Sequence, residues 1–123
     1  EMLSNKLFTS KQDAVAVAPI GSEETSNAVA AECGGYEHIS LLPPHMMAPV
    51  SFGLLQAVMA LSPECGGADL FEALIVGADT IAKFVRKLKF RKRLLLISDG
   101  HSEGIVDDDE LELFVNMMMK NDI

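Results

Sequence analysis

The chain has 123 residues, of which 49 % are hydrophobic and 23 % charged, and its 10 basic against 18 acidic side chains give a formal net charge of −8. This apolar content is enough for one hydrophobic core, so the composition excludes general disorder and predicts a single domain over residues 1–123. No apolar run approaches the roughly 20 residues that span a bilayer, and the first residues lack the apolar stretch of a signal peptide. We therefore expect a soluble, intracellular protein without membrane contacts, whose acidity disfavours nonspecific binding to nucleic acid by the domain as a whole.

The first half of the chain alternates between helical and extended patterns. Residues 1–10 have apolar side chains on one side and resemble the tail of a helix. Residues 14–20 are a short apolar run between breakers, as in a buried strand, although Pro19 donates no hydrogen bond to a sheet. A polar turn and a short helix over 28–32 follow. Residues 36–42 alternate well enough to be a second strand.

The second half contains the strongest helical periodicity. Ser51 is a good N-cap for a helix that continues to about Leu61. Residues 69–86 form the longest predicted helix, which is apolar on more than one side. The continuous apolar run at 93–98 is typical of a parallel strand covered on both faces. Residues 107–120 close the sequence as a helix that begins with acidic side chains, which suit a helix N-terminus.

Strands that alternate with helices predict an α/β fold. The expected architecture is a Rossmann-like, doubly wound and mostly parallel sheet with right-handed crossovers. Three strands are visible, whereas sheets of this class average five or six. We therefore expect a domain that is incomplete at both ends, from a larger protein.

Cys33 and Cys65 lie far apart in the sequence, and neither belongs to a CxxC motif or a Cys/His cluster. A zinc site or a disulfide framework is therefore not indicated, and we expect both residues to be buried free thiols.

Residues 100–104 read Gly-His-Ser-Glu-Gly, which matches the G-x-S-x-G pattern of a serine nucleophile after a strand. In a nucleophile elbow a helix follows at once, and a histidine comes later in the chain. Here the next helix begins only near Asp107, and no histidine follows His101. A polar loop therefore explains the segment better than a hydrolase that uses Ser102.

A carboxylate at Asp99 ends the third predicted strand, where α/β folds bind ligands. A hard cation needs several converging oxygen ligands, for which Asp69 and Ser102 are the other candidates. Asp69 is explained equally well as a helix cap. No G-x-x-x-x-G-K-[ST] or G-x-G-x-x-G motif is present, so the sequence predicts no nucleotide cofactor.

Charge segregation is the most distinctive feature of the sequence. Residues 83–93 hold seven of the ten basic side chains and no acidic one. Such a cluster produces a positive surface on an acidic body, although cations also suit the C-terminus of a helix. The candidates for contact with phosphate or an acidic partner are Lys87, Lys89, Arg91, Lys92 and Arg93.

Two segments resemble von Willebrand factor A domains. They are GGADLFEAL at residues 66–74 and RLLLISDG at 93–100, where the family has its third metal-site turn after a buried strand. More narrowly, ADLFEALIVGADTIAK at 68–83, GSEETSN at 21–27 and GGYEHISLL at 34–42 resemble the amino-terminal domain of the larger subunit of the eukaryotic Ku heterodimer, in its plant form. The similarity extends from Asp13 to Asp122.

This resemblance implies a non-catalytic domain at the periphery of a ring that threads onto double-stranded DNA ends. The implied partners are the smaller Ku subunit, DNA ends through the rest of the full-length chain, and short peptides of repair factors. The implied setting is the nucleus, in double-strand break repair by non-homologous end joining and in telomere maintenance. The family is often described as an ATP-dependent DNA helicase subunit, but no ATP-binding motif lies in this segment.

The sequence departs from the metal-binding members of the family. The chain begins after the place of their DxSxS turn, and Ala68 stands where they have a ligating threonine. The resemblance therefore implies that Asp99 is a remnant of a degenerate site. The alternative is a metal-dependent adhesion or assembly module that uses Asp99.

Overall fold

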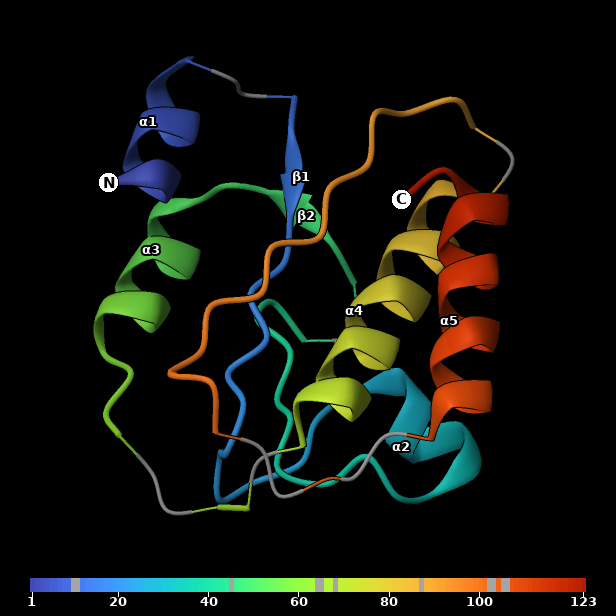
Figure 1. Cartoon of the computed structure of the whole chain (residues 1–123). Coiled ribbons are helices and arrows are strands. Elements are labelled where there is room, and N and C mark those ends of the chain that lie inside the picture. The colour runs from blue at the N-terminus through green and yellow to red at the C-terminus, as the bar shows by residue number, and fades with distance from the viewer. Residues whose placement is uncertain are drawn as a thin grey trace.

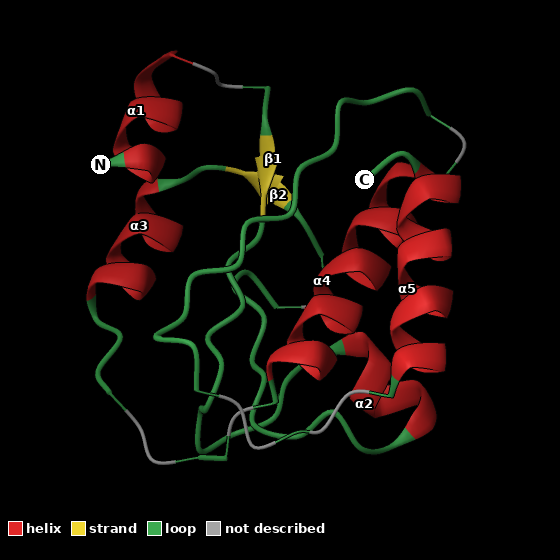
Figure 2. Cartoon of the chain, in the orientation of Figure 1, coloured by secondary structure: helices red, strands yellow, loops and turns green. Residues whose placement is uncertain are grey.

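The computed structural model describes residues 1–9, 12–44, 46–63, 66–67, 69–86, 88–101, 104 and 107–123. Figure 1 shows the course of the chain, and Figure 2 shows its helices and strands. In chain order the elements are α1 (Met2–Thr9), β1 (Ala14–Val15), α2 (Ala28–Cys33), β2 (Ala48–Pro49), α3 (Phe52–Met59), α4 (Leu70–Val85) and α5 (Asp108–Asn121).

Helices flank a central region of extended chain. In Figure 1, α1 and α3 lie on one side of the strands, and α2, α4 and α5 lie on the other. Helix α4 contacts both α2 and α5. The described chain thus combines helices with a small sheet, which is compatible with the expected α/β class.

The helices predicted near 51–61, 69–86 and 107–120 are confirmed as α3, α4 and α5, and each of the three begins at a capping side chain. Ser51 Oγ accepts a hydrogen bond from the Leu54 amide at 3.1 Å at the start of α3. The Asp69 side chain accepts hydrogen bonds from backbone amides in the first turn of α4, and the Asp107 side chain accepts one at the start of α5. These bonds satisfy amide groups that lack a partner inside the helix, so the boundaries depend on local sequence.

The sheet is smaller than predicted, and its pairing is antiparallel. Ala14 pairs with Pro49 and Val15 with Ala48. Beyond β1, the predicted strand over 14–20 continues only as isolated bridges, from Val17 to Leu42 and from Ile20 to Ile39. The pairing of β1 with residues 48–49 follows from no pattern recognised in the sequence.

The predicted strand over 36–42 is wrong at its start. Tyr36 and His38 have φ values of 53° and 60°, in the left-handed region that a strand does not contain. They belong to a turn after α2. Extended pairing begins only at Ile39, one of the most deeply buried side chains that the structure describes.

The predicted buried strand over 93–98 is also wrong in this structure. Leu95 is 65 % exposed and Ile97 is 81 % exposed. Residues 91–97 make no backbone hydrogen bond to any other described residue. An apolar run alone does not supply a neighbouring strand, so the segment stays unpaired.

The core lies between α2, α4 and the segment around Ile39. Its buried members are Val29, Ile39, Ala73 and Val76. Ile81 and Val85 of α4 are also buried. Ala73 and Val76 form the centre of the core because α2 packs on this side of α4.

Asn27 holds α2 against the segment that follows it. Its Oδ1 accepts from the Ala30 amide at 2.8 Å, and its Nδ2 donates to the carbonyl oxygens of Tyr36 and Ile39, each at 3.0 Å. The side chain is buried, so these three bonds satisfy groups that water does not reach.

The prediction of a buried thiol is wrong for Cys33. It is exposed because it is the last residue of the short helix α2, next to the turn at Gly34. Cys65 lies outside the described residues.

Candidate functional site

The basic cluster lies where α4 passes into an extended segment. Helix α4 ends at Val85 with Arg86 as its C-cap, and the chain then crosses the front of the molecule over residues 88–101 towards the start of α5 (Figure 1). These residues carry most of the predicted anion-binding side chains. Lys87 lies outside the described residues.

Alternate side chains of this segment anchor it to the helices. The Phe90 ring lies 6.4 Å from that of Phe84 between centroids. Lys92 Nζ donates to the carbonyl oxygen of Asn121 at the end of α5. Leu94 lies against α4 at Gly77, where an added Cβ would stand 2.6 Å from Leu94 Cδ1. Gly77 thus leaves the space that Leu94 occupies.

Phe90 itself is 50 % exposed, whereas Lys92 and Leu94 are partly buried, and the three cations between and beside them are exposed. Lys89, Arg91 and Arg93 alternate with Phe90, Lys92 and Leu94, which are the anchored residues. Side chains two apart in extended chain point to the same side and stand about 6.7 Å from one another. None of the three forms an ion pair with a residue that the structure describes. We call Lys89, Arg91 and Arg93 the basic row.

The remaining cations of the cluster have partners inside the protein. Lys83 bridges to Glu32 and Asp79, and Lys92 is turned towards α5. The structure therefore divides the five predicted candidates. Lys89, Arg91 and Arg93 are exposed and form no ion pair with a described residue, whereas Lys92 is tied to the end of α5.

Two aliphatic side chains continue the basic row. Leu95 and Ile97 follow Arg93 at the same spacing and are exposed, whereas Leu96 between them is less so. The sequence interpretation missed this side because the continuous apolar run suggested burial on both faces. Lys92 stands between Arg91 and Arg93, so no period-two pattern of charge was available as a signal.

Among the described residues, Asp99 belongs to no cluster of potential metal ligands. It is 79 % exposed, and its Oδ1 accepts from the His101 amide at 3.0 Å. This backbone hydrogen bond is the main cause that lowers the pKa of Asp99 below its ordinary value. No group of three or more His, Cys, Asp or Glu side chains able to hold a metal ion occurs within the described ranges. Ala68 and Ser102 lie outside them.

The capping interpretation of Asp69 is confirmed. Its Oδ1 accepts from the amides of Phe71 and Glu72, at 2.8 and 3.2 Å. An added Cβ at Gly104 would overlap the Asp69 carboxylate, so any other residue there would displace the capping side chain. This close approach gives the last glycine of the G-x-S-x-G pattern a packing role.

The described chain contains no helix that is both long enough and apolar enough to cross a membrane. A search against models of protein families finds no match.

The chain is similar in sequence to curated proteins whose names refer to DNA helicase subunits or to X-ray repair. It is 32 % identical over 94 % of its length to "ATP-dependent DNA helicase 2 subunit KU80" of Arabidopsis thaliana. It is 33 % identical over 98 % of its length to "X-ray repair cross-complementing protein 5" of Xenopus laevis. It is 31 % identical over 89 % of its length to "ATP-dependent DNA helicase II subunit 2" of Neurospora crassa.

These relatives are much longer proteins. The chain spans 18 %, 16 % and 15 % of them, in the order given above. Similarity along nearly the whole chain to proteins with these names supports the resemblance to the larger Ku subunit that the sequence motifs indicated.

Proposed function

We propose that the chain is a segment of the larger subunit of a Ku-type DNA end-binding heterodimer, in which it serves as a non-catalytic platform for protein docking. Its architecture in the full-length protein is a von Willebrand factor A-like domain, related to the plant form. It pairs with the smaller Ku subunit in the nucleus and contributes to non-homologous end joining and telomere maintenance.

The observation that carries this proposal is the similarity of 31–33 % over 89–98 % of the chain to KU80 and its counterparts. The exposed basic row supports a docking role, because unpaired cations on an acidic body attract an anionic group.

The proposal is tested with the full-length chain and the smaller subunit. We expect the two to co-purify and to bind blunt double-stranded DNA ends. Replacement of Lys89, Arg91 and Arg93 with alanine then separates two roles of the basic row. If these side chains dock proteins, DNA affinity and its salt dependence stay unchanged. If they contact DNA, the salt slope falls by about one unit per lost phosphate contact.

A matched control is Lys120→Ala, which removes an exposed cation of α5 outside the row. Failure of the full-length chain to associate with the smaller subunit would overturn the proposal. Calorimetry with Mg²⁺ provides a further check, because binding that Asp99→Ala abolishes would point to the metal-dependent module instead.

A further inference from the structure

We propose that residues 28–35, which include α2 and the two glycines after it, form a strap that lifts off α4 while the rest of the domain stays folded. The ion pair between Glu32 and Lys83 latches the strap, and Asp79 keeps Lys83 paired when the latch is open. The proposal goes beyond the docking role stated above and does not depend on it.

The base of the strap is closed by one buried side chain. Asn27 Nδ2 donates to the carbonyl oxygens of Tyr36 and Ile39, each at 3.0 Å. Asn27 is only 3 % exposed, so the residues on either side of the strap are joined where water does not compete. A short loop whose ends are held together is a self-contained unit. Residues 28–35 can therefore move without disturbing the chain on either side of them.

Few side chains hold the strap against α4. Val29 is the one residue of α2 that is buried, and it packs with Ile39, Ala73 and Val76. The second half of α2 is exposed, whereas α4 buries side chains along most of its length. Segments with few buried apolar contacts open at a lower free energy than the core to which they belong. The strap is such a segment, and α4 is not.

The far end of the strap is free to turn. Gly34 and Gly35 have φ values of 73° and 71°, in the left-handed region that glycine enters without strain. A Cβ added at either glycine would meet no atom within 4 Å. The two glycines therefore form a joint that none of the described side chains confines.

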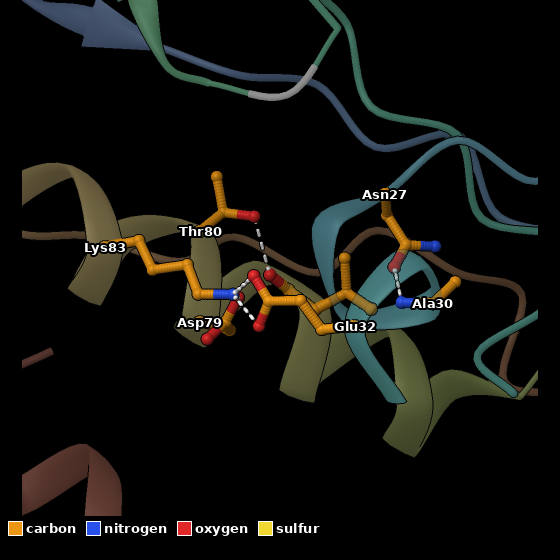
Figure 3. Close-up of polar contacts among 7 residues, drawn as sticks. Asn27, Ala30, Glu32, Asp79, Thr80 and Lys83 are labelled. Carbon is orange, nitrogen blue, oxygen red and sulfur yellow. Dashed lines mark hydrogen bonds and ion pairs between the residues drawn. The ribbon is translucent and has the colours of Figure 1, made fainter. Parts of the chain in front are cut away.

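The latch is an exposed ion pair. Lys83 Nζ donates to both carboxylate oxygens of Glu32, and Figure 3 shows this side chain reaching from α4 to α2. The Lys83 and Glu32 side chains are 43 % and 60 % exposed. Exposed ion pairs contribute little to stability and are screened by salt. The pair therefore closes the strap weakly, and added salt should loosen it.

Asp79 makes the latch easy to open. Its Oδ2 lies 3.0 Å from Lys83 Nζ, on the same helix and one turn earlier. This oxygen is buried and accepts no hydrogen bond from a described residue. When Glu32 departs, Lys83 keeps this partner, so opening does not leave the Asp79 carboxylate without a cation. In the closed position the two carboxylates also repel each other across one lysine, which favours opening.

Hydrogen exchange of the full-length protein that contains this segment tests the strap, with mass spectrometry resolving α2 from α4. We expect amides of α2 to exchange at least about tenfold faster than those of α4. Glu32→Gln should speed exchange in α2 by about two- to fivefold, the effect of losing an exposed ion pair, and leave α4 unchanged. Asp79→Asn should slow exchange in α2, because Lys83 then has no second carboxylate to hold when the strap lifts.

Thiol labelling shows whether the strap uncovers what lies beneath it. Val76→Cys places a thiol under α2, and Ala78→Cys places one at an equally buried position of α4 outside the cluster that Val29 joins. We expect the thiol at position 76 to be modified first, and faster still when Glu32→Gln is added. Glu112→Gln, on the exposed side of α5, is the matched control and should change neither exchange nor labelling.

Equal exchange in α2 and α4 would show that α2 opens only when the whole domain unfolds, and would overturn the inference. Faster exchange of α2 in Asp79→Asn would also overturn it, because Asp79 would then help to close the strap. Labelling of position 76 that is no faster than that of position 78 would show that α2 frays in place without uncovering α4.

Discussion

Lys83 of α4 donates hydrogen bonds to both carboxylate oxygens of Glu32 on α2, at 2.8 and 2.7 Å (Figure 3). Its Nζ also lies 3.0 Å from the buried Oδ2 of Asp79, one turn earlier on α4. The bond to Glu32 is the main cause that raises the pKa of Lys83, and Asp79 adds to it. A cation that the sequence placed in the basic cluster thus joins two helices.

Lys83→Met is expected to lower the urea midpoint of unfolding at pH 7, because Asp79 then faces no cation. A lysine whose pKa is raised in the folded state contributes stability below its ordinary pKa of 10.5, and this contribution is lost as the pH rises through the raised value. The difference between wild type and variant should therefore shrink as the pH rises through the raised pKa of Lys83. Lys120→Met is the control on an exposed site. Equal midpoints at pH 7 would contradict the bridging role.

Asn27→Asp should destabilise the fold by about 2–4 kcal/mol at pH 7. The substitution removes the two Nδ2 donors and sets a carboxylate beside the carbonyl oxygens of Tyr36 and Ile39. Part of the loss should be recovered at low pH, where the new carboxyl is protonated. Asn116→Asp, on the exposed side of α5, should change stability by no more than about 0.5 kcal/mol. Similar losses in both variants, measured by chemical denaturation, would refute the argument.

Gly77→Ala should loosen the segment that contains the basic row. The added Cβ meets Leu94 Cδ1 at 2.6 Å, so Leu94 has to move away from α4. We expect faster tryptic cleavage after Arg91 and Arg93, even though alanine favours the helix by about 1 kcal/mol.

Gly53→Ala is the matched control for this prediction. Its added Cβ stands 3.7 Å from Ser51 Oγ, an ordinary contact. Here α3 gains propensity with no displaced neighbour, so stability should rise by up to about 1 kcal/mol and tryptic cleavage should stay as in wild type. Cleavage that responds alike to both substitutions would show that Leu94 does not hold the segment.

Glu72→Gln should stabilise the protein at pH 7 by a few tenths of a kcal/mol. Partial burial, then the charges of Asp69 and Glu37, raise the pKa of Glu72 above 4.5. A carboxyl with a raised pKa favours the folded state when protonated. The cost of ionising it is absent well below pH 4.5 and complete once the pH exceeds the raised value. Thermal unfolding of wild type and variant should therefore coincide at pH 3 and diverge by pH 7.

Glu112→Gln, on the exposed side of α5, is the reference for this comparison. A difference between wild type and Glu72→Gln that is as large at pH 3 as at pH 7 would assign the effect to packing instead of charge.

The sequence was a good guide to the helices and a poor one to the sheet. Ser51, Asp69 and Asp107 cap the helices that they were expected to begin, because an N-cap bonds to amides two or three residues away. The pairing of Ala14 with Pro49 joins residues far apart in the chain. No local pattern encodes such a partner, so the antiparallel pair was not predicted.

The candidate site shows the same division. That seven cations gather between residues 83 and 93 is readable from the sequence. Which of these cations reach Glu32 and Asn121 depends on how α2, α4 and α5 pack, because those partners lie on other helices. Backbone pairing likewise depends on a neighbouring strand, and the apolar run after Arg93 lacks one among the described residues. The lack of backbone pairing in this run therefore depends on the tertiary structure, whereas the apolar side chains alone predicted a buried strand.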